Sequence, residues 1–366
     1  MESRHTTADF EQRAQGALMG AFIGDALALG PHWYYDLDEL HRNFGTWITD
    51  YADPKPDHYH AGLHAGQSSQ AGIILEMLAR SLADNGSYVE ADFCQRLDED
   101  LFPKLDGTPM QGPGGYTSQS IREAWRLRVQ EKRPWGEVCG LADTTEAAER
   151  VLVLAIRDAL RPGTLARNAS ANTALTQSDT TVMAMTVAYA SILGSLVRGE
   201  PLDSQTSDRL MALVRDGTLP FHSVTSTGER LPPPGPEAPR HAGQFPSPDA
   251  LLTVSNIQRA IADPDIRIEP AWKAALVYGM PCAVYHQFPA AYYLAGRFQK
   301  DFESAVLHAV NGGGQNQARA ILTGALSGAI GGIQAIPQRL LDGLERSDER
   351  QALAATIARQ AAADHP

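Results

Sequence analysis

Apolar residues recur at helical spacing along most of the chain. In four stretches, 73–82, 151–156, 182–197 and 321–336, leucine, isoleucine, valine, methionine and alanine return every three or four positions. Alanine, leucine and methionine are also strong helix formers. Alternation of apolar and polar residues, which indicates strands, is almost absent. The pattern therefore predicts an all-α fold, a single compact domain of many helices.

One segment breaks this pattern. Residues 222–249 are rich in proline and polar side chains, so no regular element is expected there. We interpret the segment as a long loop inserted into the helical domain, either a disordered surface excursion or a lid over a site. The helical domain is expected to cover residues 1–345, and residues 346–366 are expected to form a helical tail that frays toward its end.

Two predicted helices, one near each end of the chain, carry a small residue at every fourth position. The first has Gly16, Gly20 and Gly24, and the second has Ala320, Gly324 and Gly328. Stripes of this kind let two helix backbones approach closely. We expect the two helices to pack antiparallel, which would bring Gly24 and Asp25 beside Gln315. The alternative is that each stripe faces a bulky neighbour.

Composition and charge narrow the kind of partner. With 366 residues, 43% hydrophobic and 20% charged, the chain is long enough to bury a sizeable core. Its formal net charge of -12 leaves no basic surface of the kind that binds phosphate backbones. We therefore expect a small-molecule ligand and no nucleic acid.

The cysteines and the apolar segments bear on location. The chain has only Cys94, Cys139 and Cys282, without a CxxC pair, which favours a reducing compartment and argues against structural zinc. Acidic residues stand near the N-terminus where a signal peptide carries basic ones. The apolar stretch 321–336 is shorter than the roughly 20 residues that span a bilayer. We expect a cytoplasmic protein without a membrane partner.

Three stretches combine helical pattern with polar groups. In residues 20–36 a lone Asp25 interrupts an apolar helix, and residues 62–82 and 311–329 each pass from a polar loop into a helix. Ser68 or Ser69 is a good N-cap for the second of these helices. Helix N-termini present free N–H groups, so two of them in one cleft would suit an anion, or carboxylates that hold a cation.

These stretches resemble the ADP-ribosylglycohydrolase family, whose members cleave ADP-ribose from proteins or small acceptors. GAFIGDAL at 20–27 resembles the family's opening Gly-Asp-Ala-Leu helix, and residues 106–120 are similar to its glycine-rich loop. Residues 175–190 resemble a mid-chain Thr-His motif, with Gln177 at the histidine. Residues 280–314 and 324–337 are similar to the C-terminal third, and HWYYDLDEL at 32–40 resembles the J-crystallin branch. The resemblance covers roughly residues 10–345.

The chain departs from the family pattern where metal ligands are expected. Active members bind two magnesium ions through a Thr-Asp-Asp-Thr and an Asp-x-Asp-Thr segment. In the register given by the resemblance, these fall on 69–72, Ser-Gln-Ala-Gly, and on 315–318, Gln-Asn-Gln-Ala. A family glutamate falls near His32 or Trp33 and is also missing. Amides replace carboxylates poorly around magnesium, so we expect a lost metal site, no cofactor, and a mouth that prefers an anion or a polar sugar.

The candidate site residues follow from these motifs. Asp25 and His32 are the catalytic candidates; Asp25 is a general base, a remnant of the metal site, or a buried aspartate that caps neighbouring backbone. The histidines His58, His60 and His64 are expected to be solvated loop residues without a metal. The ligand-binding candidates are Trp33, Gln67, Ser69, Gln70, Gly114, Gly115, Tyr116, Asn311, Gly313, Gly314, Gln315, Asn316 and Gln317.

Three functions are compatible with this sequence. We favour a family member with a degenerate metal site that binds an ADP-ribose-like or other phosphorylated sugar ligand. The alternative is an active hydrolase of an N- or O-glycosidic, ADP-ribosyl-type bond, with its site reassembled around Asp25 and His32, although no second carboxylate stands at these motifs. The third is a structural, crystallin-like role, because a fold by itself does not define a function.

Overall fold

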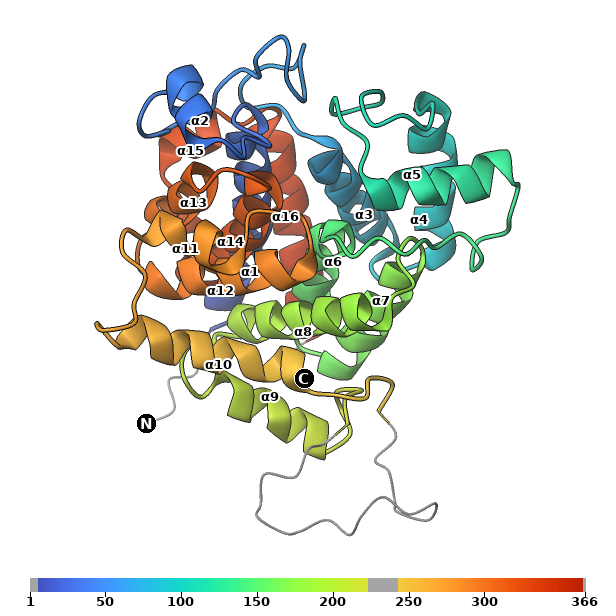
Figure 1. Cartoon of the computed structure of the whole chain (residues 1–366). Helices are drawn as coiled ribbons and strands as arrows, with labels where there is room; N and C mark the ends of the chain where they lie inside the picture. Colours follow the sequence, from blue (N-terminus) through green and yellow to red (C-terminus); the bar gives the residue numbers. More distant parts are fainter. Residues whose placement is uncertain (1–5, 223–242, 365–366) are drawn as a thin grey trace.

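The computed structural model describes residues 6–222 and 243–364, and within these ranges the chain is helical with no strand longer than an isolated bridge (Figure 1). The all-α prediction is confirmed. The helices are α1 (Thr7–Leu29), α2 (Leu37–Phe44), α3 (Gln70–Asn85), α4 (Glu90–Arg96), α5 (Gln119–Trp125), α6 (Glu146–Arg157), α7 (Pro162–Ala174), α8 (Thr180–Val197), α9 (Thr206–Arg215), α10 (Asp249–Ala262), α11 (Ala274–Tyr278), α12 (Val284–Arg297), α13 (Phe302–Asn311), α14 (Asn316–Gly331), α15 (Gln338–Asp342) and α16 (Ser347–Ala362).

Helices α1 and α14 form the centre of the fold and pack antiparallel through their small-residue stripes. A Cβ atom added at Gly20 would lie 2.1 Å from the carbonyl oxygen of Gly324, and one at Gly24 would lie 2.2 Å from that of Ala320. The predicted antiparallel packing is therefore confirmed, and the alternative of a bulky neighbour is wrong. Because the pairing is antiparallel, the end of α1 lies at the start of α14, where Trp33 N–H donates to the Gly314 carbonyl at 3.1 Å.

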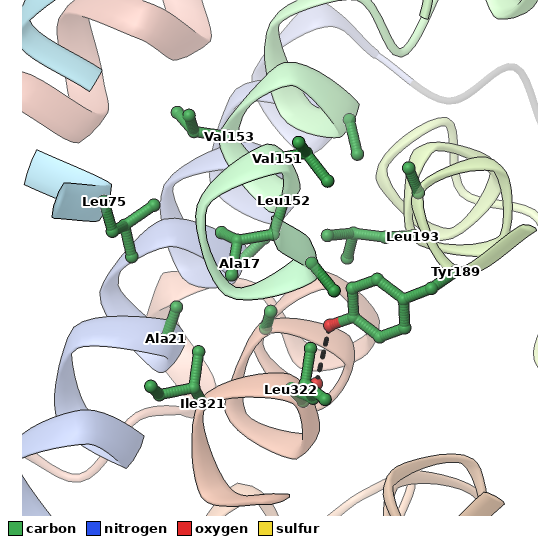
Figure 2. Packing of buried hydrophobic residues seen from close by; sticks show 14 of the residues in the cluster. Ala17, Ala21, Leu75, Val151, Leu152, Val153, Tyr189, Leu193, Ile321 and Leu322 are labelled. Atoms are coloured by element: carbon green, nitrogen blue, oxygen red, sulfur yellow. Dashed lines mark hydrogen bonds between the residues drawn. The ribbon is translucent and has the colours of Figure 1, made fainter. Parts of the chain in front are cut away.

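Helices α6 and α8 cover this central pair on one side. Figure 2 shows Leu152 of α6 beside Ala17 of α1, and Tyr189 of α8 directed toward Leu322 of α14, to whose carbonyl its hydroxyl donates at 2.9 Å. Among the described residues, α8 is the one helix long and apolar enough to cross a membrane, and 83% of it is buried inside the fold. A helix buried to this extent is typical of the core of a fold.

The C-terminal helix α16 corrects the expectation of a fraying tail. It packs against α1, α3 and α6, and its residues Ala354, Ile357 and Ala358 are buried. The Arg350 guanidinium lies 4.8 Å from the centre of the Phe22 ring and donates to Ser68 Oγ at 2.8 Å. The alanine-rich sequence reads as weakly apolar, but its small side chains let α16 lie close against α1.

The proline-rich loop falls mostly outside the described residues. Of the predicted loop 222–249, residues 223–242 are not described, so both interpretations of it stay predictions. At its edges, Phe221 and Phe245 are buried against each other with ring centres 5.0 Å apart.

Candidate functional site

A cavity of about 170 Å³ lies where α3, α6 and α14 begin. Its wall includes side chains from all three helix starts: Ser69 and Gln70, Glu146 and Glu149, and Gln315 and Gln317. Pockets that enclose a drug-sized ligand have about 300–1,000 Å³. The cavity is therefore large enough for part of a ligand the size of ADP-ribose, with the remainder outside it.

The start of α3 is held by Asp25. Ser69 is the N-cap of α3, as predicted, and its Oγ accepts from Ala71 N–H at 3.0 Å. Asp25 accepts from Ser69 Oγ at 2.5 Å and from Ser69 N–H at 3.1 Å. Burial raises the pKa of Asp25 to about 6, against the opposing effect of these hydrogen bonds. Asp25 is not among the residues that line the cavity, so its geometry matches the capping interpretation better than the catalytic one.

His32 lies in the cavity wall as one link of a buried chain of polar groups. His60 Nδ1 is 2.5 Å from the Gly114 carbonyl oxygen, His60 Nε2 is 2.6 Å from His32 Nδ1, and His32 Nε2 is 2.6 Å from the Gln315 amide. The expectation that His60 is solvated is wrong, since it is 1% exposed. His64 is exposed and His58 half-buried. A histidine in a polar loop is pulled inside here because both ring nitrogens find partners.

The number of protons available in this series of hydrogen bonds determines how the Gln315 amide is oriented. Burial lowers the pKa of His60 to about 4 and that of His32 well below its ordinary value, so both rings are neutral at neutral pH. Two neutral rings supply two protons for three contacts, and the Gly114 carbonyl only accepts. The third proton comes from the Gln315 NH₂ when the amide turns it toward His32. The Gln315 oxygen then faces the cavity.

The glycines after α13 position Trp33 through the backbone. Gly313 and Gly314 adopt φ of 63° and 59°, and a Cβ on Gly314 would lie 2.6 Å from Met280. Gly314 N–H donates to the Tyr34 carbonyl at 2.7 Å and its carbonyl accepts from Trp33. Trp33 itself has φ of 66°, which turns its ring into the cavity. These two glycines do not line the cavity, so their contribution is indirect.

The aromatic side of the cavity is formed by Trp33 and Tyr116, as predicted. Their ring centres are 5.3 Å apart, and Tyr59 lies 4.6 Å from Trp33. The Arg122 guanidinium is 6.0 Å from the centre of the Tyr116 ring and faces the same cavity. This side can stack on a base or a sugar.

Gly114 and Gly115 form a turn that packs against Gln70 and His60, two residues that line the cavity. Their φ values are 80° and 71°, and a Cβ on Gly114 would lie 2.1 Å from the Gln70 nitrogen. One on Gly115 would lie 2.7 Å from His60 Cα. Neither glycine lines the cavity, so the geometry favours a tight turn that supports Gln70 and His60 over a phosphate cradle.

Three further ligand-binding candidates lie outside the cavity, and for them the structure corrects the sequence prediction. Gln67 is directed toward the surface and donates to Glu345 at 2.9 Å. Asn311 is buried and exchanges hydrogen bonds with the backbone of Ile48 at 2.8 and 2.9 Å. Asn316 donates to the Pro31 carbonyl at 2.9 Å. Proximity in sequence to Gln315 does not place Asn311 and Asn316 in the wall, because successive helical residues point in different directions.

Sequence reasoning missed Glu146 and Glu149 at the start of α6. They are three residues apart on one helix face, and both line the cavity. The signal was the stretch TTEAAERVL, in which two glutamates precede an apolar helix. Gln177 braces this segment, since its Oε1 accepts from Ala147 N–H at 2.9 Å and its Nε2 donates to the Ala142 and Thr144 carbonyls at 2.9 and 2.8 Å.

The two glutamates share a buried environment with Arg150. Burial and, after it, the negative charge of Glu146 raise the pKa of Glu149 to about 8, and a hydrogen bond from Thr145 at 2.6 Å opposes the shift. Burial also raises the pKa of Glu146. Arg150 is committed to Asn172 and Thr176 at 2.7–2.9 Å. The pair therefore retains a proton near neutral pH.

The model of the ADP-ribosylglycohydrolase family matches residues 6–366. The chain belongs to the ADP-ribosylglycohydrolase family. An uncharacterized protein of Archaeoglobus fulgidus is 24% identical to it over 347 residues, which are 95% of this chain and 96% of the relative. A solved structure described as an ADP-ribosylglycohydrolase-related protein complex matches with a TM-score of 0.60 at 20% identity, over 97% of this chain and 99% of the other. At that identity the likeness shows the fold alone.

In this member of the ADP-ribosylglycohydrolase family, several buried polar atoms of the wall have no protein partner. They are Gln70 Oε1, Gln317 Nε2, Trp33 Nε1 and Arg150 Nη1. A buried polar atom left without a partner costs about 1–3 kcal/mol. Within residues 6–222 and 243–364, no three His, Cys, Asp or Glu side chains gather where they could hold a metal ion.

Proposed function

We propose that this protein binds an ADP-ribose-like or other phosphorylated sugar compound in the cavity, without a divalent metal ion. The observation that carries the proposal is the unpaired amide pair Gln70 Oε1 and Gln317 Nε2, one acceptor and one donor, buried at two helix starts that meet in one cavity. Sugar hydroxyls both donate and accept, so one such group can satisfy both kinds of atom.

The residues at the positions where the family resemblance expects magnesium ligands do not fit that ion. They are a serine whose hydroxyl donates to Asp25, two alanines and a glycine that offer no side-chain ligand, and amides. Among the amides is Gln70, whose Nε2 donates to Thr117 Oγ1 at 3.0 Å. Magnesium requires near-octahedral oxygen ligands and is usually held by carboxylates and water. The hydroxyl and amide groups at these positions suit a polar sugar better.

The remaining wall supports the same ligand class. Trp33 and Tyr116 offer ring faces for a base or a sugar, and half-buried Arg122 offers a positive charge for a phosphate. If the Gln315 NH₂ donates to His32, as the proton count requires, its oxygen is left to accept from a ligand. Since the cavity holds only part of an ADP-ribose-sized molecule, we expect the ribosyl end inside and the phosphates toward the mouth. The cytoplasmic location and the absence of nucleic acid and membrane partners belong to this proposal as well.

Calorimetric titration of the metal-stripped protein with ADP-ribose tests the proposal. We expect binding that is unchanged when magnesium is added. Gln317→Leu removes the unpaired donor at similar volume and should weaken binding about tenfold, the equivalent of about 1.4 kcal/mol.

Gln67→Leu is the matched control, because Gln67 lies outside the cavity and should leave the dissociation constant unchanged. Binding that needs magnesium, or that responds to Gln67 and not to Gln317, would refute the proposed pocket. No binding under either condition would favour a structural, crystallin-like role.

A further inference from the structure

Glu146 and Glu149 have no role in the proposed binding. Acidic residues in the first turn of a helix stabilise it through the helix dipole, but solvent-facing residues do this as well. Here Glu149 is 4% exposed and both carboxyls face the cavity. Burial of two carboxyls beside each other disfavours their charged forms, so helix stability does not explain why they point inward.

A second observation at the same place indicates a ligand. Gln317, which is 5% exposed, has its Nε2 buried without a partner in the same cavity wall. A group bound between Gln317 and the start of α6 would therefore meet an amide donor and two carboxyls.

The charged groups around Glu149 determine which carboxyl keeps the proton. Glu146 and Arg150 lie on its own helix, Asp25 faces it from α1, and Tyr189 faces it from α8. Glu149 is 4% exposed and Glu146 is half-buried, so loss of hydration disfavours the charged form of Glu149 more than that of Glu146. Glu149, the more deeply buried of the two, is therefore the acid, and half-buried Glu146 is the base that water can reach.

We propose that Glu149 and Glu146 are the general acid and general base of a metal-independent hydrolysis of the N- or O-glycosidic bond of an ADP-ribosyl group bound in this cavity. The proposal rests on the proposed binding function. It assigns the chemistry to the start of α6, away from the α3 and α14 positions where the family resemblance expects magnesium ligands.

The step is balanced without a further reactant. As the bond from ribose C1 to the leaving nitrogen or oxygen breaks, the Glu149 carboxyl gives its proton to the leaving atom. Glu146 accepts a proton from a water molecule whose oxygen bonds to C1. The products are ADP-ribose and the protonated acceptor, and transfer of the proton from Glu146 to Glu149 restores the pair. A proton transfer by a positioned side chain contributes typically about 10²–10⁴-fold to a rate.

The test follows the release of ADP-ribose from one N-linked and one O-linked ADP-ribosyl peptide by the full-length protein in EDTA. We expect turnover of at least one peptide, and we expect Glu149→Gln and Glu146→Gln each to lower kcat by about 100-fold or more. Both variants should bind ADP-ribose within about threefold of the wild-type protein, since they keep the shape of the wall. Glu90→Gln, at an exposed first-turn glutamate of α4, is the matched control and should not change kcat.

The measurements distinguish a failure of the acid–base assignment from a failure of ligand binding. Binding of ADP-ribose without turnover of either peptide, turnover only with magnesium, or turnover that both glutamine variants retain would overturn the acid–base assignment and leave the binding proposal standing. An absence of ADP-ribose binding in the calorimeter would remove both proposals.

Discussion

Burial keeps several ionisable side chains of this protein uncharged. His32 and His60 are neutral because burial lowers the pKa of both rings, and Glu149 keeps a proton because burial and Glu146 raise its pKa to about 8. Neutral histidines and amides line part of the cavity, and of the two glutamates at the start of α6 one keeps a proton, so hydrogen bonds as well as charge decide what the cavity accepts.

The Glu149 carboxyl makes stability depend on pH in a defined direction. Its pKa rises from 4.5 to about 8 on folding, so between these values the native state binds more protons than the unfolded state. The free energy of unfolding therefore falls as pH rises through this window. Glu149→Gln cannot ionise, so its melting temperature relative to the wild type should rise by a few degrees between pH 5 and pH 9.

Differential scanning calorimetry of both chains across this pH range measures the effect. Glu90→Gln, at an exposed position, should show a constant offset. A constant offset for Glu149→Gln as well would mean that Glu149 ionises normally in the folded protein.

Two elements, α1 and α14, determine where the site is built. Their antiparallel contact through glycine brings residue 33 next to residue 314, although 281 positions separate them along the chain. The sequence revealed this contact because a stripe of small residues at every fourth position has few other uses. It did not reveal α6, whose start completes the cavity.

Gly20→Ala should destabilise the protein strongly. The new Cβ would lie 2.1 Å from the Gly324 carbonyl oxygen, and a backbone atom in the core cannot move aside as a flexible side chain does. Overpacking typically costs about 1–3 kcal/mol, and this backbone contact belongs at the upper end or above it. Chemical denaturation monitored by circular dichroism gives the change in free energy of unfolding.

Gly163→Ala is the control for this substitution. Gly163 lies in α7, and the nearest atom to a new Cβ there is 3.4 Å away. Alanine at this helical position should be neutral or stabilise by about 0.5–1 kcal/mol. Equal effects at Gly20 and Gly163 would contradict the close packing of α1 and α14.

The molecule as a whole depends on its C-terminal helix. Helix α16 covers α1 and brings Arg350 to Glu76 at 3.3 Å and to Ser68, next to the N-cap of α3. The predicted tail is thus part of the core that supports the site.

A chain that ends at residue 345 should lose its cooperative thermal transition. Removal of α16 exposes the surfaces of α1, α3 and α6 against which it packs, and leaves Glu76 without Arg350. Circular dichroism during heating measures this, with Arg359→Ala at an exposed position of α16 as the control that should melt like the wild type. An unchanged melting curve for the shortened chain would restore the interpretation of α16 as a dispensable tail.

The sequence by itself determined the helical class, a serine N-cap at residue 68 or 69, and the two small-residue stripes from which the antiparallel contact of α1 and α14 was expected. Periodicity, small-residue stripes and capping residues can be recognised in the sequence because each acts within a few turns of one helix. The expectation that His32, Trp33 and Gln315 share one site came from the family resemblance. Family membership also followed from the order of motifs.

Only the tertiary structure decided which polar side chains face the cavity. It turned Gln67, Asn311 and Asn316 away, drew His60 inside, and added Glu146 and Glu149 from a helix that no motif had connected with the site. The reason is physical: the direction of a side chain and the charge it carries depend on the partners and the burial supplied by residues that are distant in sequence. Those partners exist only once the chain has folded.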